Sequence, residues 1–165
     1  MNESVERRLQ LYQKQEEKLQ FKTFNNKNAW EIGSLLVEQA QRQKAMVAID
    51  IRIHGYQVFR YGFDGTNLHN DMWIARKANT VNTILKSSIH VGAMLEKQDQ
   101  KIGEDWYLDP RKYAFCGGGF PITIEETGVI GSICVSGLTD VEDHQMIVDI
   151  LERYLGEKTY GKDKL

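Results

Sequence analysis

The sequence lacks the features that mark membrane, secreted and nucleic-acid-binding proteins. Among its 165 residues, no apolar run approaches the ~20 residues that a membrane helix needs, so we expect no membrane contact. The polar segment 1–8 lacks the apolar centre of a signal peptide, and we therefore expect a cytoplasmic protein. Lys and Arg number 21 against 23 Asp and Glu, and without a basic excess we expect no nucleic-acid partner.

Cysteine is scarce as well: the sequence contains 2, Cys116 and Cys134. Two cysteines are too few for a structural zinc site without histidines, and the 4 histidines show no metal-ligand spacing, so we expect no metal site. If a hairpin turns at Glu126-Thr127, Cys134 lies opposite Gly119. The two thiols are then out of register, which predicts free cysteines of the kind that a reducing compartment maintains.

What the sequence does contain is a series of short amphipathic segments, which indicate one α+β domain over residues 1–165. Alternation predicts strands over about 19–24 (a short edge strand), 47–54, 56–61, 119–125 and 128–136. Apolar spacing predicts helices over about 4–18, 29–43, 68–85 and 91–97, and a last helix that is capped by Thr139 and Glu142 and closes at Gly156. Because hairpins dominate, we expect an antiparallel sheet packed by helices, followed by a frayed tail over 157–165.

Two apolar stripes run along the predicted helix 68–85. They consist of Leu68, Met72, Ala75 and Asn79, and of Ile74, Ala78, Val81 and Leu85. Two stripes predict a helix buried over most of its surface, with Trp73, Arg76 and Lys77 on its wetter side. A tryptophan beside a cation is compatible with the wall of a binding site, with a contact between subunits or with plain packing. The residue spacing does not distinguish these three roles.

The triple glycine Gly117-Gly118-Gly119 is the strongest candidate for a binding loop. Consecutive glycines adopt positive φ easily, and their amides can then form a concavity for a phosphate, a carboxylate or a haem propionate. The segment matches neither the P-loop nor the dinucleotide fingerprint, because no lysine-serine pair or second spaced glycine follows. The alternative is a strand entry that a large neighbour crosses closely.

Two further residues, Cys116 and His144, are candidates for chemistry. Cys116 directly precedes the glycines, which fits either a thiolate activated by amides or a buried, inert cysteine. His144 follows Asp143 in the first turn of the last helix, where the helix dipole favours the acid and disfavours a charged histidine. His144 is therefore either structural or placed to contact a ligand.

Several motifs together resemble the haem-degrading-like domain family, which includes GlcG-like and HbpS-like proteins. They are the segments 70–79 (Asn-Asp-Met-Trp-Ile-Ala-Arg-Lys-Ala-Asn), Ser87-Ser88, 115–122 (Phe-Cys-Gly-Gly-Gly-Phe-Pro-Ile), 128–131 with 135–137, and Asp143-His144. The resemblance covers about residues 5–156 and is closest to the cytosolic, uncharacterised branch shared by bacteria and fungi. It implies a profilin-like α/β/α fold, in which a five-stranded antiparallel sheet carries helices on both sides, and it implies homo-oligomers.

The resemblance also names candidate site residues, because they match recurring polar and glycine positions of the family. They are Trp73, Arg76, Lys77, Cys116, Gly117, Gly118, Gly119, Phe120, Asp143 and His144. Three functions remain open: an oligomeric protein that binds a small anionic ligand or haem near the triple glycine, an assembly or protein-interaction module, and an enzyme using Cys116 or His144. Haem as a cofactor is implied by the resemblance alone.

Overall fold

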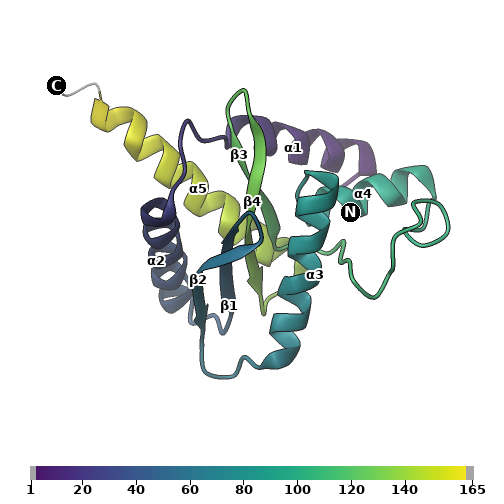
Figure 1. Cartoon of the computed structure of the whole chain (residues 1–165), viewed down its shortest axis with the longest axis horizontal. Coiled ribbons are helices and arrows are strands. Elements are labelled where there is room, and N and C mark those ends of the chain that lie inside the picture. The colour runs from purple at the N-terminus through teal and green to yellow at the C-terminus, as the bar shows by residue number, and fades with distance from the viewer. Residues whose placement is uncertain (1–2, 163–165) are drawn as a thin grey trace.

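The computed structural model describes residues 3–162, which form five helices and four strands (Figure 1). The helices are α1 (Val5–Lys18), α2 (Asn26–Gln43), α3 (Leu68–Ile84), α4 (Ser88–Gln98) and α5 (Asp140–Lys162). The strands are β1 (Ala48–Ile53), β2 (Tyr56–Gly62), β3 (Gly119–Ile124) and β4 (Gly128–Ser136). The α+β class expected from the element order is confirmed.

The strands form one antiparallel sheet in the order β2-β1-β4-β3. The hairpin of β3 and β4 has the predicted register, with Gly119 opposite Cys134. Both Cys116 and Cys134 are free thiols. The hairpin that contains the triple glycine is therefore half of the sheet, and one of its strands is central.

Helices cover both faces of the sheet, as Figure 1 shows with α2 and α5 on one side and α3 on the other. Alternate residues of β1 divide between the two faces: Ile49 and Ile51 join the large core under α2 and α5, whereas Ala48 packs with Cys134 under α3. The predicted helices on both sides of the sheet are thus confirmed.

The fifth strand of the expected sheet is not formed in residues 3–162. The predicted edge strand 19–24 is reduced to a single parallel bridge between Phe21 and Ile124. The Phe21 amide donates to the Thr123 carbonyl at 2.8 Å, but the chain then turns into α2 at Asn25. The Asn25 side chain caps that helix, which leaves too little extended chain for a strand.

The prediction of two buried stripes on α3 is wrong. Leu68 and Met72 are 79% and 59% exposed, whereas Lys77, expected on the wetter side, is only 3% exposed. The reason is that α3 packs mainly on β4 and β3, so a single stripe with Ile74 and Ala78 faces the sheet. Lys77 lies on this inner stripe, so its charged ammonium group needs a partner inside the protein.

The last helix begins as predicted but does not close at Gly156. The Thr139 hydroxyl and the Glu142 carboxylate form the expected capping box. The helix then continues to Lys162, because Gly156 meets no obstacle and the pair Arg153–Glu157 spans it at 3.0 Å. The tail predicted as frayed is therefore helical to residue 162, and residues 163–165 lie outside the described part of the chain.

The N-terminal helix α1 lies against α4, to the side of the sheet (Figure 1). Tyr12 packs on Ile89 and Ala93 of α4 in a small apolar cluster of its own. The helix α4 begins at Ser88, three residues earlier than predicted, because Ser87 takes the N-cap position. None of the helices within residues 3–162 is long and apolar enough to cross a membrane.

Candidate functional site

The triple glycine is buried under the first turn of α5. A Cβ built on Gly117 would lie 1.8 Å from the Asp140 carbonyl oxygen. At Gly118, whose φ is +111°, it would lie 2.3 Å from the Val135 carbonyl oxygen and 2.7 Å from Lys77 Nζ. The glycines thus permit a close crossing of backbone, which is the alternative that the sequence left open.

Lys77 and Asp143 form a buried ion pair at this crossing. Lys77 Nζ lies 3.2 Å from Asp143 Oδ2 and donates to the Val135 carbonyl at 2.8 Å. Asp143 also accepts a hydrogen bond from the Leu138 amide at 3.0 Å. Burial raises the pKa of Asp143, and the Lys77 ammonium opposes that shift. The pair fixes α3 and α5 to the end of β4.

One amide of the triple glycine, that of Gly119, already has a partner within the chain, and so does the Gly137 amide beside the loop. The Gly119 amide donates to Ser88 Oγ at 3.0 Å, and the Gly137 amide donates to Asp143. The carboxylate of Asp143 is thus an internal anion beside the loop. Binding of an external anion by Gly117 and Gly118 stays a prediction.

Trp73 and Arg76 form a stack of their own on α3. The guanidinium carbon of Arg76 lies 4.2 Å from the centroid of the Trp73 ring, and Arg76 Nε donates to the Met72 carbonyl at 3.2 Å. Both side chains are partly exposed, whereas Lys77 is buried. The structure therefore brings Lys77, Asp143 and His144 to the glycine loop, while the guanidinium of Arg76 interacts with its own helix.

The thiol of Cys116 lies in surroundings that disfavour a thiolate. Burial raises its pKa, and the nearby Lys77 ammonium opposes this only in part. For Cys134, which is fully buried, the pKa rises to about 12. Neither environment is that of an activated nucleophile, whose pKa is lowered.

His144 is the candidate residue with an unused polar atom. It is 2% exposed, and its Nε2 lies 2.7 Å from Gln15 Oε1. Its ring meets the Tyr12 ring edge-on at a centroid distance of 5.3 Å and the Phe120 ring at 5.9 Å. Burial lowers the pKa of His144 to about 4, so the imidazole is neutral near pH 7. Its Nδ1 is buried and has no hydrogen-bond partner within residues 3–162.

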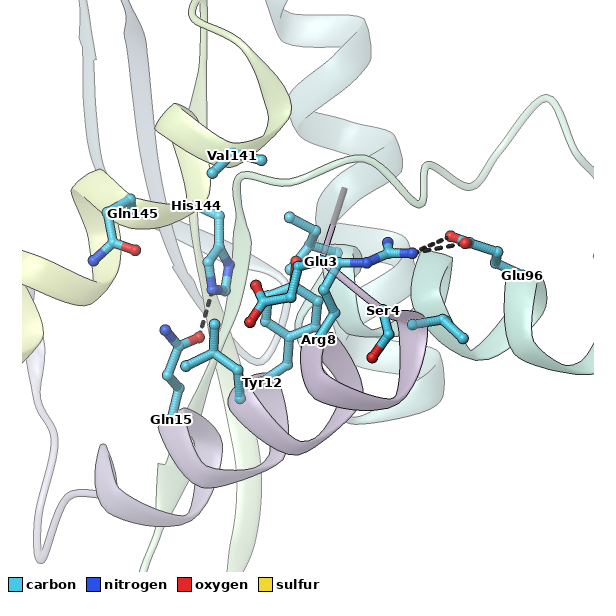
Figure 2. A pocket seen from close by; sticks show the side chains of 12 residues that line it. Glu3, Ser4, Arg8, Tyr12, Gln15, Glu96, Val141, His144 and Gln145 are labelled. Carbon is cyan, nitrogen blue, oxygen red and sulfur yellow. Dashed lines mark hydrogen bonds and ion pairs between the residues drawn. The ribbon is translucent and has the colours of Figure 1, made fainter. Parts of the chain in front are cut away.

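A cavity of about 660 Å³ opens beside His144, between α1, α4 and the start of α5 (Figure 2). Figure 2 shows His144 pointing from α5 toward Gln15 and Tyr12 of α1. On another side of the cavity, Arg8 pairs with Glu96 of α4 at 2.7 Å. The lining also includes the apolar side chains of Val5, Leu11, Ile89 and Val141.

A second buried histidine lies next to this cavity. His90 Nδ1 lies 2.9 Å from the Glu16 carboxylate, whose other oxygen accepts from the Ser87 amide at 2.7 Å. The Tyr12 ring lies between the two histidines, 6.2 Å from the His90 ring. Glu16 thereby ties α1 to the first turn of α4.

Sequence reasoning identified His144 but missed the residues of α1 that surround it. Arg8, Tyr12 and Gln15 lie on a charged helix with a thin apolar stripe, which predicts a surface helix and no site. The one available signal was Tyr12, an aromatic residue in that thin stripe. The partner helices of α1 are more than seventy residues away in the sequence, and local spacing carries no information about them.

The close crossing at Gly117 makes a testable prediction. Replacing Gly117 with alanine is expected to lower the free energy of unfolding by about 1–3 kcal/mol, because the new methyl group overlaps the Asp140 carbonyl and neither backbone can yield freely. Urea denaturation followed by circular dichroism measures the change. Gly156→Ala is the matched control: apart from its chain neighbours and the adjacent backbone of its own helix, no atom of the described residues lies within 4 Å of its built Cβ, so it should raise stability by about 0.5–1 kcal/mol. Equal effects at both positions would contradict the crossing.

Comparison with known proteins places this chain in a wider group. A family model described as haem-degrading, HbpS-like proteins matches residues 24–152. A UPF0303 protein of Streptomyces coelicolor is 44% identical over 145 residues, which make up 88% of this chain and 92% of the relative.

Solved structures show the same fold as this chain. The crystal structure of the Ybr137w protein is 30% identical with a TM-score of 0.84, covering 92% of this chain and 89% of that one. Crystal structures of HbpS and of a PduOC–haem complex share the fold at 19% identity, with TM-scores of 0.64 and 0.61. They cover 82% and 78% of this chain, and 92% and 93% of their own.

Proposed function

The chain belongs to the family of haem-degrading, HbpS-like proteins, and from that premise we propose that it binds haem in the cavity between α1, α4 and α5. In this proposal His144, which lines the cavity, would hold the haem iron through a ring nitrogen. The site adjoins the triple glycine, since the Cβ of His144 lies 3.1 Å from the Cβ position built on Gly117.

The observation that carries the proposal is the unpartnered Nδ1 of His144. A buried polar atom without a hydrogen bond destabilises the folded protein. Such an atom is therefore consistent with a site where a bound ligand supplies the missing partner. A neutral imidazole has one such lone pair, and histidine is the commonest axial ligand of haem iron. The pKa of about 4 keeps the imidazole neutral, and therefore competent to bind a metal, throughout the physiological range.

The cavity also suits the rest of a haem molecule. Its volume of about 660 Å³ falls within the roughly 300–1,000 Å³ of ligand pockets. Apolar side chains such as Val5, Leu11 and Ile89 suit a porphyrin ring. The Arg8 guanidinium binds the Glu96 carboxylate in this structure, so a haem propionate, which is also a carboxylate, would have to replace Glu96 there.

Among proteins of this fold, the PduOC structure is described as a haem complex. Because that chain is only 19% identical to this one, it supports the type of ligand and not the residues that hold it. Bound haem would supply an iron centre able to bind small ligands or exchange electrons. The chain's own residues would hold the ligand, orient it and exclude water.

Titration with hemin tests the proposal. Addition of hemin to the purified protein is expected to produce a shifted, saturable Soret band with a stoichiometry of one per chain. His144→Ala is expected to weaken hemin binding at least about tenfold, because loss of an iron ligand costs no less than loss of the groups that support one.

The control is His69→Ala, which makes the same change at an exposed histidine beside Trp73. Circular dichroism verifies that each variant is folded. His144→Gln provides a second variant if alanine leaves too large a cavity. Equal hemin affinity of the wild type and both folded His144 variants would refute the assignment.

A second role, as a homo-oligomeric assembly module, is favoured by exposed apolar side chains near β2. Trp30 and Tyr56 are 66% and 74% exposed, and β2 is an edge strand with one unpaired side.

The free cysteines fit a reducing compartment such as the cytoplasm. Catalysis by Cys116 has less support, since the raised pKa of its thiol opposes nucleophilic use.

A further inference from the structure

We propose that Gln15 is a positioning residue, which holds His144 in the tautomer that carries its proton on Nε2 and so leaves the Nδ1 lone pair for a ligand. This inference rests on the proposed function of the cavity and names the residue that prepares it. Gln15 lies outside residues 24–152, the segment that the family model matches.

The first step is the hydrogen bond itself. Gln15 Oε1 lies 2.7 Å from His144 Nε2, and an amide oxygen can only accept. Nε2 must therefore donate, and it carries the proton. A neutral imidazole has a single ring proton, so Nδ1 is left bare.

The second step is that Nδ1 has no competing partner. It is buried and makes no hydrogen bond to the described part of the chain, so no acceptor there favours a proton on Nδ1. A doubly protonated ring would place a second, positively charged N–H group at this buried position without an acceptor among residues 3–162, which disfavours it. Among the described residues, Gln15 is thus the hydrogen-bond partner that favours one of the two neutral tautomers over the other.

The third step is that Gln15 is held in place. Its neighbour Glu16 binds both the Ser87 amide and His90, which fixes α1 against α4. One turn earlier, Tyr12 packs on α4 and places its ring edge-on to the His144 ring. Figure 2 shows Gln15 and Tyr12 projecting from α1 toward the start of α5. A half-buried amide on a fixed helix can impose a tautomer, whereas a mobile one cannot.

Nitrogen NMR on the ligand-free protein tests the inference directly. In protein labelled with ¹⁵N at histidine, long-range ¹H–¹⁵N correlations at pH 7 should show His144 as a single tautomer protonated on Nε2. In Gln15→Leu the same residue should show a mixture of tautomers, because leucine offers no acceptor. Gln15→Glu should restore the single tautomer, since its carboxylate accepts in place of the amide oxygen.

Gln13→Leu is the matched control, because it makes the same change on the exposed face of α1. The His144 signals are assigned by replacing His54, His69 and His90 one at a time. Gln15→Ala replaces Gln15→Leu if the larger side chain disturbs the packing. A single Nε2-protonated tautomer in the folded Gln15→Leu and Gln15→Ala variants would overturn the inference.

The affinity for hemin gives a second readout. Gln15→Leu should bind hemin roughly tenfold more weakly than the wild type, as expected for loss of a group that orients a ligating histidine. Gln15→Glu should retain most of the affinity. The two proposals fail separately: if no form binds hemin, the haem site is refuted, while the NMR result still decides the role of Gln15.

Discussion

Replacing Lys77 with methionine is expected to lower the free energy of unfolding by about 3–5 kcal/mol. Lys77 and Asp143 are 3% and 4% exposed at their side chains, so removal of the ammonium leaves a carboxylate buried without its counter-charge. The Val135 carbonyl loses a hydrogen bond at the same time. Methionine preserves the length of the side chain, which confines the effect to the charge and the hydrogen bond.

Urea denaturation of four proteins measures this effect. Lys14→Met is the control for the same substitution at an exposed position of α1 and should stay within about 0.5 kcal/mol of the wild type. The double variant Lys77→Met, Asp143→Asn should be more stable than Lys77→Met alone. An asparagine oxygen still accepts from the Leu138 amide but carries no charge. A loss below 1 kcal/mol in Lys77→Met would show that the pair contributes little.

Lowering the pH from 6.5 to 4 is expected to reduce the free energy of unfolding by about 3 kcal/mol through His144 alone. The pKa of His144 falls from the ordinary 6.5 to about 4 in the folded chain, because burial disfavours the charged ring. Between these values the unfolded chain binds a proton at this residue and the folded chain does not. Each unit of pKa difference is worth about 1.36 kcal/mol, so stability present above pH 6.5 is lost as the pH falls toward 4.

The comparison of the wild type with His144→Gln isolates this contribution. Glutamine does not titrate, so the stability of the variant should fall less steeply between pH 6.5 and pH 4. Other groups near the ring, notably Asp143, Glu16 and His90, are present in both proteins and largely cancel in the difference. Parallel stability curves for the two proteins would mean that His144 is not held neutral by burial.

These two results concern neighbouring residues with different roles. Lys77 and Asp143 satisfy one another and the surrounding backbone, so their contribution is to stability. His144 has one ring nitrogen, Nδ1, without a hydrogen-bond partner among residues 3–162, and it is this nitrogen that we propose for a ligand. The sequence analysis named Lys77, Asp143 and His144 alike as candidates, and only the contacts in the fold distinguish the structural ion pair from the proposed ligand.

Local patterns were sufficient to predict most of the elements. The alternation in 119–136 predicted the hairpin and the pairing of Gly119 with Cys134, because side chains of a strand alternate strictly between two faces. The spacing of Thr139 and Glu142 predicted the start of α5. Local patterns failed to predict the end of α5, because Gly156 does not terminate that helix. They also failed at residues 19–24, where the N-cap of α2 at Asn25 cuts the predicted strand short.

The sequence by itself determined the α+β class, the hairpin over 119–136 that follows the first two glycines of the triple glycine, and His144 as a candidate, since each depends on residues close together in the chain. Only the tertiary structure decided that Lys77 is buried, that α5 crosses the glycines, and that α1 completes a cavity at His144. Gln15 and His144 are 129 positions apart, and their contact follows from how whole helices pack on the sheet. That packing is a property of the complete core, which no local spacing encodes.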